Sequence, residues 1–295
     1  MSLGSRDDRD EKPHGFGWRT PVKTQLTVGM DLKLQTQTGS GPERETPNIA
    51  LMLSHDPGRA VAAYFASRRR ENIVAVYFEN DDSYASDITA LLGIEACRVF
   101  FGKPVLSNRV HIDWLASQNV DFVVTVYWPW LLSNAFLHSI RDSVNFHPSL
   151  LPANRGWYPH VHSIVNGSPN GVSLHRISER ADEGAIWAQR SVTIPLTFTA
   201  KSAYLDLQNE IVDLFTETWD RISSGQLEPT PQSSVGASYH HRAELEELDR
   251  IDLGSLTGLE LYNILRARTF GARGYAYIEI GGKKHYLSLG VEPEL

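Results

Sequence analysis

Short runs of apolar residues recur through the first half of the chain and predict buried strands. Residues 49–53 read Ile-Ala-Leu-Met-Leu, residues 73–78 hold a second run, and residues 121–127 read Asp-Phe-Val-Val-Thr-Val-Tyr. A strand that is covered on both faces lacks the alternation of a half-exposed strand. These runs therefore indicate a sheet with helices on both faces, and a further short strand is expected at 99–101.

Helical patterns separate these predicted strands. Asp56 stands before a proline at the first helical position, which predicts a capped helix from there to about Arg70. The other predicted helices cover 84–92, 111–117 and 200–222. Strands that alternate with helices at this spacing form a parallel sheet, so the predicted fold class is α/β, a Rossmann-like and mainly parallel sheet with helices on both faces.

The two ends of the chain differ in pattern from this central part. Residues 1–47 mix charges of both signs with a polar run, and we interpret them as a mobile, dispensable N-terminal extension with at most one edge strand near 28–34. The predicted catalytic domain covers 48–235 and ends in a polar linker. Residues 236–295 are predicted to form a small C-terminal subdomain of a helix and a β-hairpin.

Two local signals define that subdomain. Thr257 and Glu260 have the spacing of a capping box that opens a helix through Arg268, and Gly281-Gly282 joins two predicted strands. A helix and a hairpin are too small to stand alone, so they must pack on the main domain or on another subunit. Because their apolar side chains exceed what one small contact would cover, we predict a homodimer. These side chains are Leu259, Tyr262, Leu265, Tyr275, Tyr277 and Tyr286.

Composition narrows the classes of function. The chain is 41% hydrophobic and carries a net charge of −7, so bulk nucleic acid and anionic membranes are poor partners. Cys97 is the single cysteine, which excludes an internal disulfide framework and a cysteine-rich zinc site. No apolar run is long enough to cross a membrane and no signal-peptide core stands at the start, so we expect a cytoplasmic protein. The turn at 54–59 has one glycine and no dinucleotide or phosphate-loop motif.

The densest polar cluster lies at 143–156, where Asn145 and His147 are two residues apart. In an extended segment both side chains leave the same face, at the C-terminal edge of the predicted sheet. An amide that holds a developing oxyanion and an imidazole that moves a proton suit acyl transfer. The same pattern also fits a buried pair that only satisfies loop backbone, and Asp182 also fits ordinary turn chemistry.

Taken in order, several segments are similar to one enzyme family. They are Asn-Phe-His-Pro-Ser-Leu-Leu-Pro at 145–152, Arg-Gly at 155–156, Gly-Val-Ser-Leu-His at 171–175, and Asp182-x-Gly184-x-Ile186. Their order and spacing resemble the formyltransferases that use 10-formyltetrahydrofolate, over roughly residues 49–222. The resemblance implies that Asn145, His147 and Asp182 occupy the family's catalytic positions.

The C-terminal part indicates the branch of that family. Methionyl-tRNA formyltransferases carry a larger and usually basic C-terminal barrel, whereas residues 239–295 hold seven Lys and Arg against nine Asp and Glu. The segments at 155–159 and 239–242 instead look like the nucleotide-linked amino-sugar N-formyltransferases, whose substrates include dTDP- or GDP-linked amino-dideoxy sugars. Formylation of another amine, such as methionyl-tRNA or hydroxyornithine, stays open, as does a catalytically silent folate- or sugar-binding relative.

The resemblance also implies where the ligands bind. The folate should lie along 127–132 and the loop before Asp182, so its candidate binding residues are Trp128, Leu131, Leu132 and Arg155. Arg155 would hold an anion of the cofactor or substrate, or it would only brace a loop.

Four further residues are candidates for binding the nucleotide sugar. They are Trp157, Tyr158, Tyr239 and His240, whose rings could stack on a base or simply pack in the core or an interface. His162 and His240 also belong to short histidine pairs, but neither pair has a further cysteine or acidic residue at ligand spacing. No metal site is therefore predicted.

Overall fold

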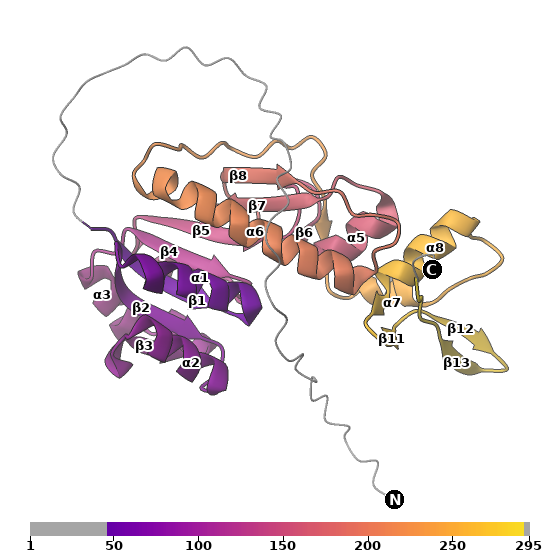
Figure 1. Cartoon of the computed structure of the whole chain (residues 1–295), viewed down its shortest axis with the longest axis horizontal. Coiled ribbons are helices and arrows are strands. Elements are labelled where there is room, and N and C mark those ends of the chain that lie inside the picture. Colours follow the sequence, from indigo (N-terminus) through magenta and orange to yellow (C-terminus); the bar gives the residue numbers. More distant parts are fainter. Residues whose placement is uncertain (1–45, 292–295) are drawn as a thin grey trace, which may run out of the picture. The chain divides into compact units, whose positions relative to one another are not determined.

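A computed structural model describes residues 46–291, and its centre is a seven-stranded sheet (Figure 1). The strand order is β3-β2-β1-β4-β5-β7-β8, parallel from β3 to β5 and antiparallel at β7 and β8. The bounds are β1 Asn48–Leu53, β2 Asn72–Phe78, β3 Val99–Phe101, β4 Phe122–Val126, β5 Asp142–His147, β7 Gly171–His175 and β8 Ile186–Ser191. The predicted α/β class is confirmed.

Helices cover both faces of this sheet. One face packs against α1 (His55–Arg68), α2 (Ser83–Leu92) and α6 (Ala200–Ser223), and the other against α3 (Arg109–Ser117) and α4 (Asn134–Leu137). Alternate side chains of β1 enter the two cores, with Leu51 on the first face and Met52 on the second. An uninterrupted apolar run is therefore what the central strand requires.

The start of α1 differs from the prediction. The helix begins at His55, and Ser54, not Asp56, is its N-cap residue in an extended conformation. The hydroxyl of Ser54 donates to Glu79 Oε1 at 2.6 Å, and its carbonyl accepts from the amide of Gly58. Asp56 therefore lies in the first turn, where its charge complements the helix dipole.

The C-terminal segment packs on the catalytic part through a third apolar cluster. Val161 and Ile164 of α5 (Pro159–Asn166) meet Ala203 of α6, Leu245 of α7 (Glu244–Asp249) and Ala267 of α8 (Gly258–Ala267). The predicted capping box at the start of α8 is confirmed, and so is the hairpin of β12 (Tyr277–Ile280) and β13 (Lys283–Tyr286). The remaining elements are η1 Ala96–Arg98, η2 Lys103–Ser107, β10 Thr269–Phe270 and β11 Arg273–Gly274.

A two-stranded parallel ribbon was not predicted. It pairs β6 (Arg155–Gly156) with β9 (Tyr239–His240), and strands of two residues leave no hydrophobic pattern in a sequence. The ribbon joins the polar cluster after β5 to the segment that leads into α7.

Two predictions about the chain's organisation are not decided here. The interpretation of residues 1–47 falls almost wholly outside the described residues, and the boundary between 48–235 and 236–295 stays a prediction. Among residues 46–291, no helix combines the length and the apolar character needed to span a membrane.

Candidate active site

Three polar side chains form a row across neighbouring strands. The register places Thr125 of β4 and His175 of β7 on either side of Asn145 in β5. Residues directly opposite in a sheet share a face, so their side chains can meet. The Thr125 hydroxyl donates to Asn145 Oδ1 at 2.6 Å, and Asn145 Nδ2 donates to His175 Nε2 at 2.9 Å. The row holds the Asn145 amide in one orientation.

His147 projects from the same face of β5, two residues beyond Asn145. Its Nε2 donates to the carbonyl oxygen of Asn154 at 3.0 Å, which leaves Nδ1 as the nitrogen free to exchange a proton. This Nδ1 lies 3.5 Å from Asp182 Oδ1. The structure thus brings His147 and Asp182 together and places Asn145 on the same strand face, and their catalytic role stays a prediction.

Asp182 reaches the site from the loop before β8. Its backbone has a φ of +57°, a left-handed conformation that Asp tolerates better than most residues. Its Oδ1 lies 3.5 Å from both His147 Nδ1 and His175 Nε2, and its Oδ2 accepts from the amide of Gly156 at 2.9 Å. Gly184 closes the loop so tightly that a Cβ there would collide with the carbonyl of Arg176.

The charges of this pair follow from burial and contact. Burial lowers the pKa of His147 and outweighs the opposite effect of Asp182. Burial by itself would raise the pKa of Asp182, but His147, His175 and the Gly156 amide together lower it. At neutral pH the site therefore holds a neutral imidazole beside a carboxylate, which together can accept one proton.

The predicted folate-binding segment, residues 127–132, lies on the face of the sheet that carries Thr125 and Asn145. Trp128 and Leu132 pack in the apolar cluster that includes Val123, two residues before Thr125 on β4, whereas the side chain of Leu131 is 64% exposed. Trp128 Nε1 is buried and has no hydrogen-bond partner within the described part of the chain. A buried N–H without a partner is costly, so this group fits a ligand that supplies an acceptor.

Arg155 is already engaged by neighbouring groups. Its Nη2 and Nε donate to Gln232 Oε1 at 2.7 and 3.1 Å, and its Nη1 lies 3.6 Å from Glu183. Gln232 Nε2 in turn donates to the carbonyls of Asp182 and Gly184. These contacts match the loop-bracing alternative, and anion binding by Arg155 stays a prediction.

The four candidate sugar-binding residues lie on or beside the β6–β9 ribbon. Trp157 and Tyr239 are exposed and Tyr158 is half-buried at the start of α5. The ring of His240 is covered on one face by His162 and hydrogen-bonded at both nitrogens, so it is less available for stacking on a base than the other three. Base stacking by the other three stays a prediction.

Sequence reasoning missed three residues of this site. Thr125 had a signal, since it is the one polar residue inside an otherwise apolar strand core, and His175 ended a segment already matched to the family. Gln232 had none, because it stands in a polar linker and reaches the site only through the fold.

Two family models match the chain. The model described as formyl transferase matches residues 40–217, which is more than half of the chain. The chain belongs to the formyl transferase family. The model described as the N-formyltransferase dimerization C-terminal domain matches residues 244–293 of this formyltransferase.

Individual relatives agree with this assignment. A dTDP-4-amino-4,6-dideoxyglucose formyltransferase of Mycobacterium tuberculosis is 30% identical over 215 residues, which cover 72% of this chain and 87% of the relative. A sugar N-formyltransferase structure from Shewanella superposes with a TM-score of 0.70 at 20% identity, covering 84% and 99% of the two chains. The Helicobacter canadensis N-formyltransferase, solved with folinic acid and dTDP-3-aminofucose, gives 0.61 at 18% identity and covers 81% and 86%.

Proposed function

We propose that this formyltransferase transfers the formyl group of 10-formyltetrahydrofolate to the amine of a nucleotide-linked amino sugar, as a homodimer in the cytoplasm. The observation that carries the proposal is the convergence of Asn145, His147 and Asp182 at the C-terminal end of β5. The substrate class is supported by the extent of the similarity to a dTDP-amino-sugar enzyme, and the dimer by the matched C-terminal domain.

In the proposed reaction the sugar amine attacks the formyl carbon directly. A C–N bond to the sugar forms, the bond between the formyl carbon and the folate nitrogen breaks, and the amine loses a proton. Asn145 Nδ2 has a second hydrogen besides the one given to His175, and this hydrogen can hold the developing oxyanion.

His147 accepts the proton that the amine loses, and Asp182 stabilises the resulting charge. Because Nε2 of His147 is committed to the Asn154 carbonyl, proton transfer uses Nδ1. The Asp182 carboxylate, 3.5 Å away, stabilises the imidazolium that results. The protonated ring can then donate to the oxyanion or return the proton to the folate nitrogen as the bond to it breaks.

The folate is assigned to the loop that follows β4. The unpartnered Trp128 Nε1 would donate to an acceptor on the pterin, and the indole and Leu132 supply apolar surface on the same sheet face as Asn145. Leu131 is placed at the outer edge of this surface.

The test is a screen of the purified full chain with 10-formyltetrahydrofolate and a panel of dTDP-, GDP- and UDP-linked amino sugars, read by mass. A gain of one formyl group on a single sugar, absent with Asp182→Asn, is the expected result. Methionyl-tRNA and hydroxyornithine are included as competing substrates. Formylation of either of them in preference to every sugar would refute the proposed substrate class, and no transfer at all would favour a silent binding protein.

A further inference from the structure

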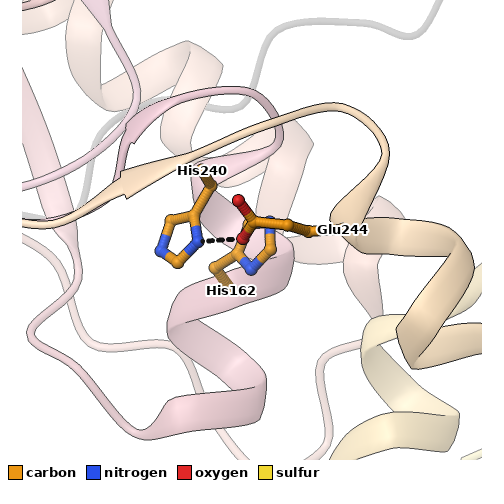
Figure 2. A group of neighbouring side chains, drawn as sticks. All are labelled: His162, His240 and Glu244. Carbon is orange, nitrogen blue, oxygen red and sulfur yellow. Dashed lines mark hydrogen bonds and ion pairs between the residues drawn. The ribbon is translucent and has the colours of Figure 1, made fainter.

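A second polar cluster lies beside the β6–β9 ribbon, outside the catalytic trio. It consists of His162 from α5, His240 from β9 and Glu244 from the first turn of α7 (Figure 2). Two segments that are far apart in the sequence therefore contribute, with His162 in one and His240 and Glu244 in the other. One ligand atom of each residue lies within 4.8 Å of the other two.

Within this cluster the two rings and the carboxylate are already in contact. The rings of His162 and His240 are stacked with centroids 3.6 Å apart, and His240 Nδ1 lies 2.8 Å from Glu244 Oε2, the contact dashed in Figure 2. Glu244 Oε1 accepts from the amide of His241 at 2.7 Å, which fixes the carboxylate.

The hydrogen bonds around His240 call for a positive charge on its Nδ1 side. Asn154 Nδ2 donates to Ser168 Oγ at 2.7 Å, so Asn154 Oδ1 faces His240 Nε2 and accepts its proton at 3.0 Å. Nδ1 of a neutral ring would then direct a lone pair at the Glu244 carboxylate. That contact needs a second proton or a metal ion between the two groups.

His162 distinguishes these two possibilities. Its side chain is buried, and Nε2 has no hydrogen-bond partner among residues 46–291. A second proton on His240 would satisfy Glu244 but would do nothing for His162, whereas a metal ion could take a ligand from all three residues.

We propose that His162, His240 and Glu244 bind one divalent transition-metal cation per chain, with Zn²⁺ as the representative ion. Two imidazoles and one carboxylate are a donor set that suits Zn²⁺, and three protein ligands leave one position for water. The Asn154 oxygen on the far nitrogen of His240 is the outer hydrogen bond that metal-binding histidines usually make. Metal–ligand bonds of about 2.0–2.1 Å in a tetrahedral site place the ligand atoms a little over 3 Å apart, so the rings must rotate out of their stack, with His240 Nδ1 and Glu244 Oε2 moving slightly apart and His162 approaching them.

The sequence analysis missed this site because its two histidines belong to different histidine pairs. Glu244 stands four residues after His240, while His162 comes from a segment that precedes β7. Only the packing of α5 against the ribbon brings the three together.

A metal ion at this position would stabilise the fold. It would tie α5 to the segment that leads into α7, and it would hold Asn154, whose carbonyl accepts the proton of His147 Nε2. An ion that binds only the folded chain raises the melting temperature, so Zn²⁺ should stabilise the protein against heat.

The test uses the full chain after removal of metal with a chelator. Calorimetric titration with Zn²⁺ should give one ion per chain, and Co²⁺ should produce the visible absorption of a nitrogen- and oxygen-coordinated ion. His162→Ala and Glu244→Gln should each weaken Zn²⁺ binding at least about tenfold and abolish the thermal stabilisation. His241→Ala, which removes an exposed neighbouring histidine, is the matched control and should bind like the parent.

Circular dichroism of the metal-free variants separates lost binding from lost folding. Glu244→Gln keeps the size of the side chain and an oxygen for the His241 amide, so it should fold even if His162→Ala does not. Absence of stoichiometric Zn²⁺ binding by the parent chain would show that the cluster is not a metal site. Binding that persists unchanged in folded Glu244→Gln would place the ion elsewhere, and either result overturns the proposal.

Discussion

At the scale of single residues, the position of Asp182 decides what His147 can do. The carboxylate is fixed by the Gly156 amide at 2.9 Å and lies 3.5 Å from the only nitrogen of His147 that is free to titrate. Without the carboxylate, no opposite charge would offset the desolvation cost of protonating the buried imidazole. The pair therefore acts as one proton acceptor, and neither member should suffice without the other.

Substitution of this pair should slow turnover with little change in affinity for the sugar. Asp182→Asn keeps shape and polarity but removes the charge, and His147→Asn removes the imidazole. Loss of a positioned donor or base typically costs about 10²–10⁴ in rate, so kcat should fall at least roughly a hundredfold in each variant. The double variant should be scarcely slower than the worse single one, because the groups act as a unit. Steady-state kinetics and equilibrium binding measure these effects.

Calorimetry provides the control for that experiment. If the two residues only braced the loop after β5, the melting temperature and sugar binding would fall in step with the rate. A folded Asp182→Asn protein that binds sugar tightly and turns over at a near-normal rate would exclude the catalytic assignment.

His160 predicts a pH dependence of stability. Burial, and then His162 and Arg268, lower the pKa of His160 to about 4, and its Nδ1 has no hydrogen-bond partner in the chain between residues 46 and 291. The unfolded chain takes up a proton near pH 6.5 that the folded chain refuses, so the stability present above that pH is lost as the pH falls toward 4. Between pH 7 and pH 5 the parent should lose about 1–2 kcal/mol more than His160→Phe. Urea unfolding at both pH values, with chelator present, measures the difference, and equal losses in the two proteins would contradict it.

Residues that the sequence predicted differ in kind from those it missed. Asn145 and His147 are close in sequence and share a strand, so the period of two was enough to place them on one face. His175 and Gln232 act through the pairing of β5 with β7 and through a linker that folds back on the Asp182 loop. Contacts between segments so far apart in the chain leave no local pattern in the sequence.

At the scale of elements, the short β6–β9 ribbon connects the two polar clusters. The amide of Gly156 donates to Asp182, and the opposite residue in the ribbon is His240. Gly156 has a φ of +86°, and a Cβ there would collide with the carbonyl oxygen of His240. The ribbon thus depends on glycine both for its conformation and for the close approach of its two strands.

Gly156→Ala should therefore damage both stability and catalysis. Strain at a positive φ costs on the order of 1–3 kcal/mol, and the collision adds to it by pushing the strands apart. Because the Gly156 amide holds the Asp182 carboxylate in place by a hydrogen bond, kcat should fall at least about tenfold. Thermal unfolding and kinetics measure the two effects.

Gly167→Ala is the matched control for this change. Gly167 also has a positive φ, +67°, but a Cβ there meets no atom within 4 Å. The control should lose stability from strain alone and keep its turnover. Equal effects of the two substitutions would show that the ribbon does not position Asp182.

Elements with strong local patterns were predicted well. The four parallel strands β1 to β4 and helix α6 followed from apolar runs and helical spacing, because a buried strand leaves a continuous apolar run. Strands β5, β7 and β8 were not predicted as strands, because polar residues interrupt their apolar positions. The N-cap of α1 was predicted at Asp56, but the helix begins one residue before it, at His55. Ser54, with its extended backbone, is therefore the N-cap residue.

At the scale of the whole molecule, the C-terminal segment carries apolar side chains that nothing in the described chain covers. Leu259 of α8 and Tyr286 of β13 are 61% and 63% exposed, within the region matched by the dimerization domain. Tyr262, Leu265, Tyr275 and Tyr277, by contrast, are already half-buried within the chain. The exposed apolar residues of this region thus differ from those that the sequence suggested, since Leu253 and Ile280 are also exposed.

Leu259→Glu should convert the homodimer to a monomer. In a two-fold symmetric interface each substitution occurs twice, and burying one leucine is worth about 1.5–3 kcal/mol, so dissociation should become at least about a hundredfold more favourable. Val110→Glu makes the same change at an exposed site on α3 and should leave assembly intact. Sedimentation at micromolar concentration should show twice 33.1 kDa for the parent and the control, and 33.1 kDa for Leu259→Glu. A parent chain that sediments only as a monomer would refute the dimer, and a dimeric Leu259→Glu would move the interface away from α8.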